Sequence, residues 1–400
     1  MAKKNDDFFK EKKVWSEVKD ELLGCYFKPY ISKILHTYKP LVYVDCFAGK
    51  GKFDDGQPGS PIIALDIITE CVKQSKTNRR VINANFIDLN YAAELTKNLE
   101  GYPSINVIAG DYEKEIENLL STKDGCNVFL YIDPYGIKAL KCSYFDNFAN
   151  YNFNSIELLI NMNSFGFFRE ACNALGAKYD NASIFEDLIE YNPTKMNASE
   201  KSIKELNEIA GGDYWQVIVE EYKKNKIDGY QAESTFAEQY CKRLSQSYDY
   251  VLNMPLRVKR GQRPKYRMIH ATNHADGCLI MVDNIHNRWQ MIQDIQNCGQ
   301  ISLWEENCEN RIIDEKEIKE KVTKHFRQYE KKISLNEAFA NFFVEYGAIC
   351  STNIVRSIVK ELGGKGKIDI IRTPKITKKG KPSTFMTEGK GKKIEIRWLS

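Results

Sequence analysis

Residues 41–53 read LVYVDCFAGKGKF, and this stretch decides the fold that we expect for the chain. Four strand-forming residues run into Asp45, and a turn of small residues that includes Gly49 and Gly51 follows. A short apolar run bounded by turn residues is typical of a buried parallel strand. Glycines just past such a strand let the backbone approach a ligand, because no Cβ stands in the way. The stretch therefore predicts the floor of a nucleotide-type pocket, and an ordinary strand-to-loop turn is the alternative.

The glycine turn differs from the common phosphate-binding loops. No Lys-Ser or Lys-Thr pair follows the glycines, and the third glycine of the dinucleotide fingerprint is absent from the sequence. The turn resembles the first motif of class I S-adenosylmethionine-dependent methyltransferases, where an acid and an FAGxG turn hold the methionine end of the cofactor. The resemblance implies that S-adenosylmethionine is the cofactor and that these residues bind it: Asp45, Phe47, Ala48, Gly49 and Gly51.

Composition excludes several classes of protein. Hydrophobic residues make up 42% of the 400 residues and charged residues 28%, as in soluble globular proteins, and the length suggests two or three domains. No apolar run approaches the roughly 18 residues of a membrane span, and the first residues lack the apolar core of a secretory signal. The 11 cysteines form no C-x-x-C pair, which favours reduced, buried thiols over a disulfide framework or a zinc site. We expect a cytoplasmic protein with no membrane segment and no metal site.

Charge is distributed unevenly along the chain. The formal net charge is +4, but residues 331–400 hold 15 Lys and Arg against 6 Asp and Glu, an excess of nine positive charges. The preceding 330 residues therefore have a net charge of −5. A basic tail on a mildly acidic body favours a polyanionic partner. We expect nucleic acid, DNA or RNA, to bind residues 331–400.

Two further strands are expected to end in acids. Residues 81–87 form a strand that ends at Asp88, where a carboxylate can accept hydrogen bonds from both hydroxyls of a ribose. The alternative role of Asp88 is to cap the next helix. Residues 105–109 form a third strand, and Asp111 follows it at a position suited to an adenine amino group.

A fourth buried strand, residues 127–132, ends in Asp133-Pro134-Tyr135-Gly136. Amino-directed methyltransferases have an acid or amide, then prolines and an aromatic residue, at this place. A carboxylate and a carbonyl that accept the two N–H bonds of an exocyclic amine can turn its lone pair toward a methyl group, and an aromatic ring can hold the base in line. We assign these catalytic roles to Asp133, Pro134 and Tyr135. The usual form is D-P-P-Y rather than D-P-Y-G, and a simple strand-ending turn is the alternative.

The other segments are interpreted from periodicity and turn residues. Ser60 and Pro61 are expected at the N-cap and first position of a helix, and residues 15–36 form a helix that either packs in the core or helps to cover the pocket. Residues 266–273 and 277–282 read as an antiparallel hairpin that completes the sheet. A basic loop (257–265) precedes this hairpin, a strand (301–304) follows it, and a helix covers 316–329.

The tail is similar to a winged helix, with two helices (335–346 and 352–362) and two strands (367–373 and 393–398) around a lysine-rich loop. The whole chain then divides into an N-terminal helical segment, a Rossmann-like class I methyltransferase domain in two pieces, a helical insertion, a linker helix and this basic domain. The predicted boundaries are 1–40, then 41–170 with 251–310, then 171–250, 311–330 and 331–400.

The order of motifs makes one resemblance specific. The segments VDCFAGKG, GSPIIAL, FIDLN, YIDPYG, LLINMN and YRMIHATNHADGCLIMVDNI are similar, in this order, to the three-Cys-motif partner proteins. The resemblance covers most of the chain and implies a class I methyltransferase fold and a radical-SAM-like partner protein with three cysteines. The first functional hypothesis is a methyltransferase that acts on an amino group of a nucleic-acid base. The alternatives are a non-catalytic adaptor that binds a nucleotide-like ligand and nucleic acid, and a small-molecule or protein methyltransferase.

Overall fold

The structure is a computed structural model that describes residues 6–12, 14–75, 82–178, 200–256, 266–297, 314–389 and 391–399. The chain forms two compact units, Met1–Asn273 and His274–Ser400. The predictions for the basic loop (257–265) and for the strand at 301–304 lie outside the described residues. Among the residues described, no helix has the length and apolar character needed to cross a membrane.

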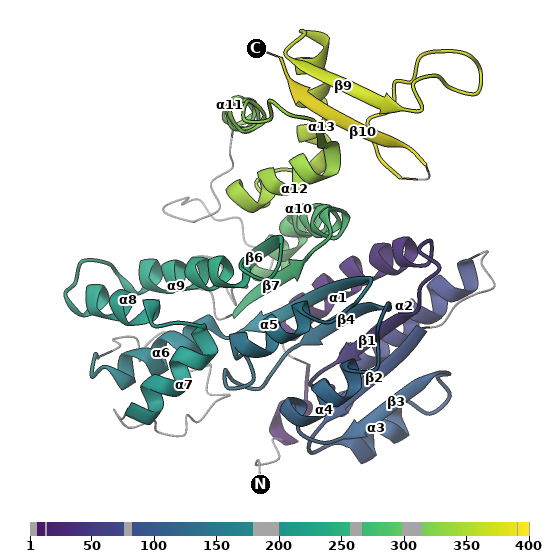
Figure 1. Cartoon of the computed structure of the whole chain (residues 1–400). Helices are drawn as coiled ribbons and strands as arrows, with labels where there is room; N and C mark the ends of the chain where they lie inside the picture. Colours follow the sequence, from purple (N-terminus) through teal and green to yellow (C-terminus); the bar gives the residue numbers. More distant parts are fainter. Residues whose placement is uncertain are drawn as a thin grey trace. The chain divides into compact units, whose positions relative to one another are not determined.

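The first unit is built on a seven-stranded sheet with the order β3-β2-β1-β4-β5-β7-β6 (Figure 1). Strands β1 to β5 are parallel, whereas β7 runs antiparallel to both β5 and β6. This mostly parallel α/β sheet is compatible with the Rossmann-like class that the sequence predicts. The strands are β1 (Leu41–Asp45), β2 (Ile82–Asp88), β3 (Ile105–Ala109), β4 (Asn127–Ile132), β5 (Ser155–Met162), β6 (Tyr250–Leu256) and β7 (Tyr266–Thr272).

The predicted hairpin of residues 266–273 and 277–282 is wrong. Its first half is strand β7, but its second half belongs to a long helix, α10 (Ala275–Asn297). An antiparallel pair does complete the sheet, and it is made by β6 and β7, with Leu256 opposite Tyr266. Periodicity cannot distinguish a short apolar run in a strand from one in a buried helix, and the run at 277–282 is of this kind.

Helices cover both faces of the sheet, so β1 and β4 are buried along their whole length. On one face, the rings of Tyr43 and Phe129 pack against Phe27 of helix α1, with ring centroids 4.8 and 4.9 Å away. On the other face, Val42 and Val44 belong to a core that helices α4 and α5 complete. Strands buried on both sides need an uninterrupted apolar sequence, which explains the pattern of residues 41–44 and 127–132.

Helix α1 of the first unit lies within two residues of the predicted range 15–36, whereas no range was predicted for η1, α4 or α5. Helix α1 precedes the sheet, and a short 3-10 helix, η1, precedes α1. The bounds are η1 (Asp6–Phe9), α1 (Val14–Ile34), α2 (Ser60–Gln74), α3 (Ala92–Asn98), α4 (Tyr112–Leu120) and α5 (Cys142–Ala149).

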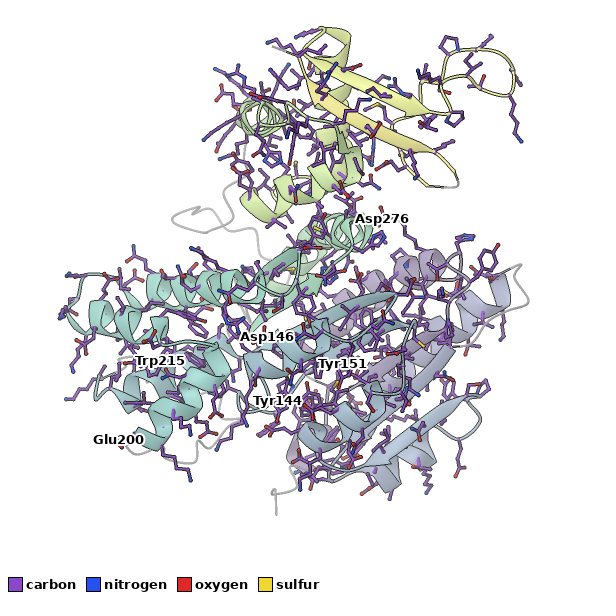
Figure 2. The ribbon with its side chains drawn as sticks, viewed as in Figure 1. Tyr144, Asp146, Tyr151, Glu200, Trp215 and Asp276 are labelled. Carbon is purple, nitrogen blue, oxygen red and sulfur yellow. The ribbon has the colours of Figure 1, made fainter. Side chains whose placement is uncertain are left out.

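Between β5 and β6 the described residues form turns and four helices: α6 (Ser164–Ala174), α7 (Glu200–Ala210), α8 (Tyr214–Lys223) and α9 (Gly229–Leu244). An ion pair links this segment to the sheet helices. Figure 2 shows Asp146 on α5, where its carboxylate binds the guanidinium of Arg243 on α9 and accepts a 2.6 Å hydrogen bond from Ser247. Trp215 of α8 is buried and donates its indole N–H to Asn207 of α7 over 2.8 Å.

The second unit combines four helices among its described residues with a small antiparallel sheet of order β8-β10-β9. Asp283 of α10 accepts hydrogen bonds from the backbone N–H and the hydroxyl of Thr352, at 2.9 and 2.8 Å. These bonds fasten α10 to the start of α13. The elements are α10, α11 (Glu315–Phe326), β8 (Ile333–Ser334), α12 (Leu335–Tyr346), α13 (Thr352–Gly364), β9 (Ile368–Thr373) and β10 (Lys393–Trp398).

Candidate functional site

A cavity of about 620 Å³ lies at the edge where the parallel strands of the first unit end. It sits at the switch point of the sheet, because β1 and β4 are neighbours there although β2 and β3 lie between them in the chain. Cavities of this size are typical of small-ligand sites. The residues predicted from the sequence that line this cavity are Phe47, Ala48, Gly49, Gly51, Asp88, Asp111, Asp133, Pro134 and Tyr135.

Two glycines with positive φ shape the turn after β1. The φ angles are +60° at Gly49 and +75° at Gly51, in a region that residues with a Cβ rarely adopt. A Cβ on Gly51 would also lie 2.7 Å from the side chain of Leu95, and a Cβ on Gly49 would lie 2.8 Å from the ring of Phe9. Glycine is therefore required at both positions by backbone conformation and by space.

Backbone hydrogen bonds tie this turn to the neighbouring strands. Cys46 donates its N–H to the carbonyl of Tyr131 at the end of β4, over 2.9 Å, and Ala48 donates to Ile87 of β2 over 3.0 Å. The N–H of Gly59, just before α2, donates to the carbonyl of Gly51 over 2.9 Å. Three main-chain hydrogen bonds therefore hold the turn in place, and none of them depends on the identity of a side chain.

Asp45 is fully buried behind the cavity wall. Its carboxylate accepts a 2.6 Å hydrogen bond from the hydroxyl of Ser60 and a 3.2 Å bond from the N–H of Phe47. Burial raises the pKa of Asp45 to about 7, although both hydrogen bonds oppose the shift and Asp133 and Asp20 add to it. Ser60, and not Asp45, is among the residues that line the cavity.

The contact with Asp45 corrects the prediction for Ser60. Ser60 is the first residue of helix α2 and not its N-cap, and Gly59 holds the N-cap position without a side-chain bond. Pro61 follows at the start of the helix, as predicted. The hydroxyl of Ser60 is used by a carboxylate from another strand, which local capping rules do not consider.

The carboxylate of Asp88 is held almost entirely by backbone donors. One oxygen accepts the N–H of Gly49 over 2.9 Å, and the other accepts the N–H groups of Asn90 and Tyr91 over 2.8 and 2.7 Å. An ionised carboxylate offers about four lone-pair directions, and three of them are filled here. Asp88 therefore joins the glycine turn to the loop before α3, whatever else it binds.

Asp111 is exposed at the end of the cavity that β3 borders. It is the N-cap of helix α4, and its side chain accepts the N–H of Glu113 over 2.9 Å. An Asp at this position satisfies a free backbone donor and complements the positive end of the helix dipole. Asp111 therefore has a structural role in addition to its place on the cavity wall.

The turn after β4 is held by side chains from distant elements. Asp133 accepts a 2.7 Å hydrogen bond from the ammonium of Lys19 on α1 and a 2.6 Å bond from the amide of Asn161 on β5. The carbonyl of Pro134 accepts the N–H of Gly136 over 2.9 Å. Both oxygens that were predicted to accept amine protons thus already have partners, whereas the side chain of Tyr135 is exposed at the cavity.

Sequence reasoning missed the contribution of helix α1, which brings Ser16, Lys19 and Asp20 to the cavity. All three are polar residues on the same helix stripe as the buried Leu23 and Phe27, at spacings of three and four. Polar side chains on the apolar stripe of a helix were the available signal. The expectation that this helix either packs in the core or helps to cover the pocket is confirmed in both respects.

The start of the chain also reaches the cavity, which the sequence did not indicate. Phe8 and Phe9 of η1 line it, and the ring of Phe9 packs on Tyr91 with centroids 4.9 Å apart. The ammonium of Lys12 binds the carbonyl of Pro58 over 2.9 Å and the carboxylate of Asp20 over 2.7 Å. These contacts fasten the first turns of the chain over the loop that precedes α2.

No protein-family model and no curated protein matches the chain. Among solved structures, a Legionella pneumophila protein of the family DUF519 is 11% identical with a TM-score of 0.40, covering 70% of this chain and 93% of that protein. A cyclopropane-fatty-acyl-phospholipid synthase-like protein from Lactobacillus casei is 8% identical with a TM-score of 0.25, covering 64% of this chain and 91% of that protein. Neither likeness assigns an activity to this chain. Within the described ranges, no group of three or more His, Cys, Asp or Glu side chains could hold a metal ion.

Proposed function

We propose that the protein is an S-adenosylmethionine-dependent methyltransferase. The observation that carries the proposal is the convergence of two separate motifs on one cavity. The glycine turn after β1 and the Asp133–Gly136 turn after β4 are more than 80 residues apart in the chain, and both line the same 620 Å³ space at the switch point of the sheet. Open α/β sheets bind their ligands at this place.

The residues that line the cavity fit the proposed cofactor. The turn at Gly49 and Gly51 presents backbone without side chains. The hydroxyl of Ser16 at the cavity wall is buried and has no hydrogen-bond partner within the described part of the chain. In this proposal Asp88 and Asp111 lie on the nucleoside side, beside the exposed Leu89. When bound, S-adenosylmethionine supplies an electrophilic methyl group. The chain itself has to orient the acceptor and exclude water.

For the acceptor, we propose an amino group of a nucleic-acid base, oriented by Asp133 and Pro134 and stacked on Tyr135. Each oxygen of Asp133 already accepts one hydrogen bond, from Lys19 or Asn161, and the carbonyl of Pro134 accepts one from Gly136, so such an amine would use their remaining lone pairs. The ring of Tyr135 supports the stacking role, because it lines the cavity and is exposed. Residues 331–400, interpreted as a winged-helix-like domain with a lysine-rich loop, would hold the phosphate backbone.

The hydrogen bonds that Asp133 and Pro134 already accept within the protein favour a second candidate function. In this reading the first unit binds S-adenosylmethionine or a related nucleotide without catalysis, and the basic tail binds nucleic acid. The chain would then serve as an adaptor for a radical-SAM-like protein with three cysteines, as the resemblance to three-Cys-motif partner proteins implies. The hydrogen bond from Lys19 to Asp133, the predicted catalytic acid, is the structural observation that supports this alternative.

Calorimetric titration of the purified full-length protein with S-adenosylmethionine and S-adenosylhomocysteine tests the proposal first. Micromolar binding is expected, and it would justify a methyl-transfer screen on DNA, tRNA and rRNA, with and without the partner protein. An Asp133→Ala variant is expected to bind the cofactor and to lose transfer. Unchanged transfer would remove the role of Asp133, and failure of well-folded protein to bind either ligand would reject the methyltransferase proposal.

A further inference from the structure

The end of the cavity covered by helix α1 contains a cluster of charges that the predicted roles do not use. Asp20 of α1 pairs with Lys12, and Lys19 of α1 pairs with Asp133, each with a nitrogen–oxygen distance of 2.7 Å. The side chains of Asp20 and Lys19 are only 13% and 8% exposed, so both pairs are largely removed from water. The charge of Asp20 in turn acts on the buried Asp45, whose pKa it helps to raise.

This cluster has one more acid than it has cations. It contains the carboxyl groups of Asp20, Asp45 and Asp133, and the ammonium groups of Lys12 and Lys19, which pair with Asp20 and Asp133 respectively. Burial raises the pKa of Asp20 to about 6; Lys12 and Lys19 oppose the shift, and Asp133 adds to it. A buried carboxylate with a raised pKa is one that a further positive charge would stabilise. The cluster therefore has the electrostatics of a site for a cationic group.

A second observation at the same end indicates a polar ligand. The hydroxyl of Ser16 is buried, lines the cavity and has no hydrogen-bond partner among the residues that the structure describes. A buried polar group without a partner is unfavourable, and most such groups in native proteins are satisfied by water or by a ligand. Ser16 and Asp20 are four residues apart on one helix, so their side chains lie on the same face.

We propose that Asp20 binds the α-ammonium group of an amino-acid moiety whose α-carboxylate is held by the hydroxyl of Ser16. This inference rests on the proposed function, in which that moiety is the methionine end of S-adenosylmethionine. It moves the role that the sequence assigns to Asp45 onto a residue of the helix that precedes the sheet. S-adenosylmethionine has a net charge of +1 from its sulfonium, ammonium and carboxylate groups, which balances the single excess acid of the cluster.

Truncated ligands test this assignment without a methyl acceptor. We would titrate the full-length protein and its Asp20→Asn variant with S-adenosylhomocysteine and with 5′-methylthioadenosine, which lacks the amino-acid end. Asp20→Asn is expected to weaken binding of S-adenosylhomocysteine at least tenfold and to change binding of 5′-methylthioadenosine less than twofold. An equal effect on both ligands, or none on either, would overturn the proposal.

An Asp45→Asn variant gives the matched comparison, because its amide oxygen can still accept the N–H of Phe47 while its NH₂ group can donate to the hydroxyl of Ser60. If the loss specific to S-adenosylhomocysteine occurs in Asp45→Asn and not in Asp20→Asn, the sequence-based assignment is correct and ours is wrong. If the unaltered protein binds none of these ligands, the proposed function fails, and this outcome is distinct from binding that Asp20→Asn leaves unchanged.

Proton release provides a readout on the unaltered protein. An ammonium group beside Asp20 favours the ionised carboxylate, so S-adenosylhomocysteine should displace protons near pH 6 and bind more tightly as the pH rises from 5.5 to 7.5. Calorimetry at pH 6 in buffers with different ionisation enthalpies measures this release. Release with S-adenosylhomocysteine that is absent with 5′-methylthioadenosine supports the proposal, and equal release with both contradicts it.

Discussion

The turns after β1 and after β4 border the same cavity but are held in place by different means. The glycine turn after β1 is fixed mainly by backbone hydrogen bonds and by φ angles that suit glycine. The turn after β4 is fixed by the ammonium of Lys19 and the amide of Asn161, which reach Asp133 from residues 114 and 28 positions away in the chain. The first turn therefore depends mainly on main-chain groups, its own and those of β2 and β4, whereas the second depends on side chains of α1 and β5.

This difference bears on the proposed chemistry. A backbone cradle keeps its shape whether or not a ligand is bound, which suits a cofactor site. An ion pair between a buried lysine and a partly exposed carboxylate can exchange partners when a ligand brings its own hydrogen-bond donors. In the proposed enzyme, the turn after β4 would be the part of the site that rearranges.

The largest expected effect comes from breaking the ion pair that holds the turn after β4. Lys19→Met removes the cation beside Asp133 and should lower the free energy of unfolding by about 3 kcal/mol, because a largely buried charge loses its partner. Urea denaturation measures the change. Lys28→Met is the matched control, since Lys28 lies on the same helix and forms an exposed pair with Glu70 over the same 2.7 Å distance. Equal stability of the two variants would show that the Lys19 pair does not anchor the turn.

The next effect tests the glycine turn after β1. Gly51→Ala places a Cβ 2.7 Å from Leu95 at a φ of +75° and should cost about 2 kcal/mol of stability, with at least tenfold weaker cofactor binding. Gly56→Ala, at φ +88° with nothing within 4 Å of its Cβ, carries only the backbone strain and should cost about 1 kcal/mol. If thermal unfolding of the two variants coincides, the contact with Leu95 does not constrain the turn.

The smallest effect concerns the side chain that supports the turn after β1. Asp88→Asn retains one oxygen that can accept N–H groups, but its NH₂ group would face the N–H of Gly49. A loss of about 1 kcal/mol in the free energy of unfolding is expected. Asp111→Asn serves as the control, because Asn and Asp cap helices equally well and α4 should be unaffected. A loss of more than about 3 kcal/mol in Asp88→Asn would mean that a side chain, and not the backbone, dominates this turn as well.

Much of the framework follows from local sequence. Residues 41–45, 105–109 and 127–132 are strands with the predicted bounds, because a continuous apolar run ending in turn residues has few other stable arrangements in an α/β protein. Helices α12 and α13 and strands β9 and β10 of the second unit also lie within two residues of their predicted ranges. Parallel strands end at one edge, so the acids after β1 to β4 were expected near one another.

The errors have a common physical origin. The run at 277–282 is apolar in either a strand or a helix, and only the pairing of β6 with β7 decides between them. Ser60 suits an N-cap by its local sequence, but a buried carboxylate from β1 takes its hydroxyl. In each case a partner distant in the chain overrides a local preference.

The sequence by itself determined the α/β class, the strands β1 to β4 and the glycines of the turn after β1, because these depend on residues that are near neighbours in the chain. Only the tertiary structure decided that Asp45 is buried and bonded to Ser60, and that Lys19 is bonded to Asp133. It also decided that Ser16 and Asp20 line the cavity. Burial and ion pairing are set by the packing of whole elements against one another, and periodicity within one element carries no information about its partner.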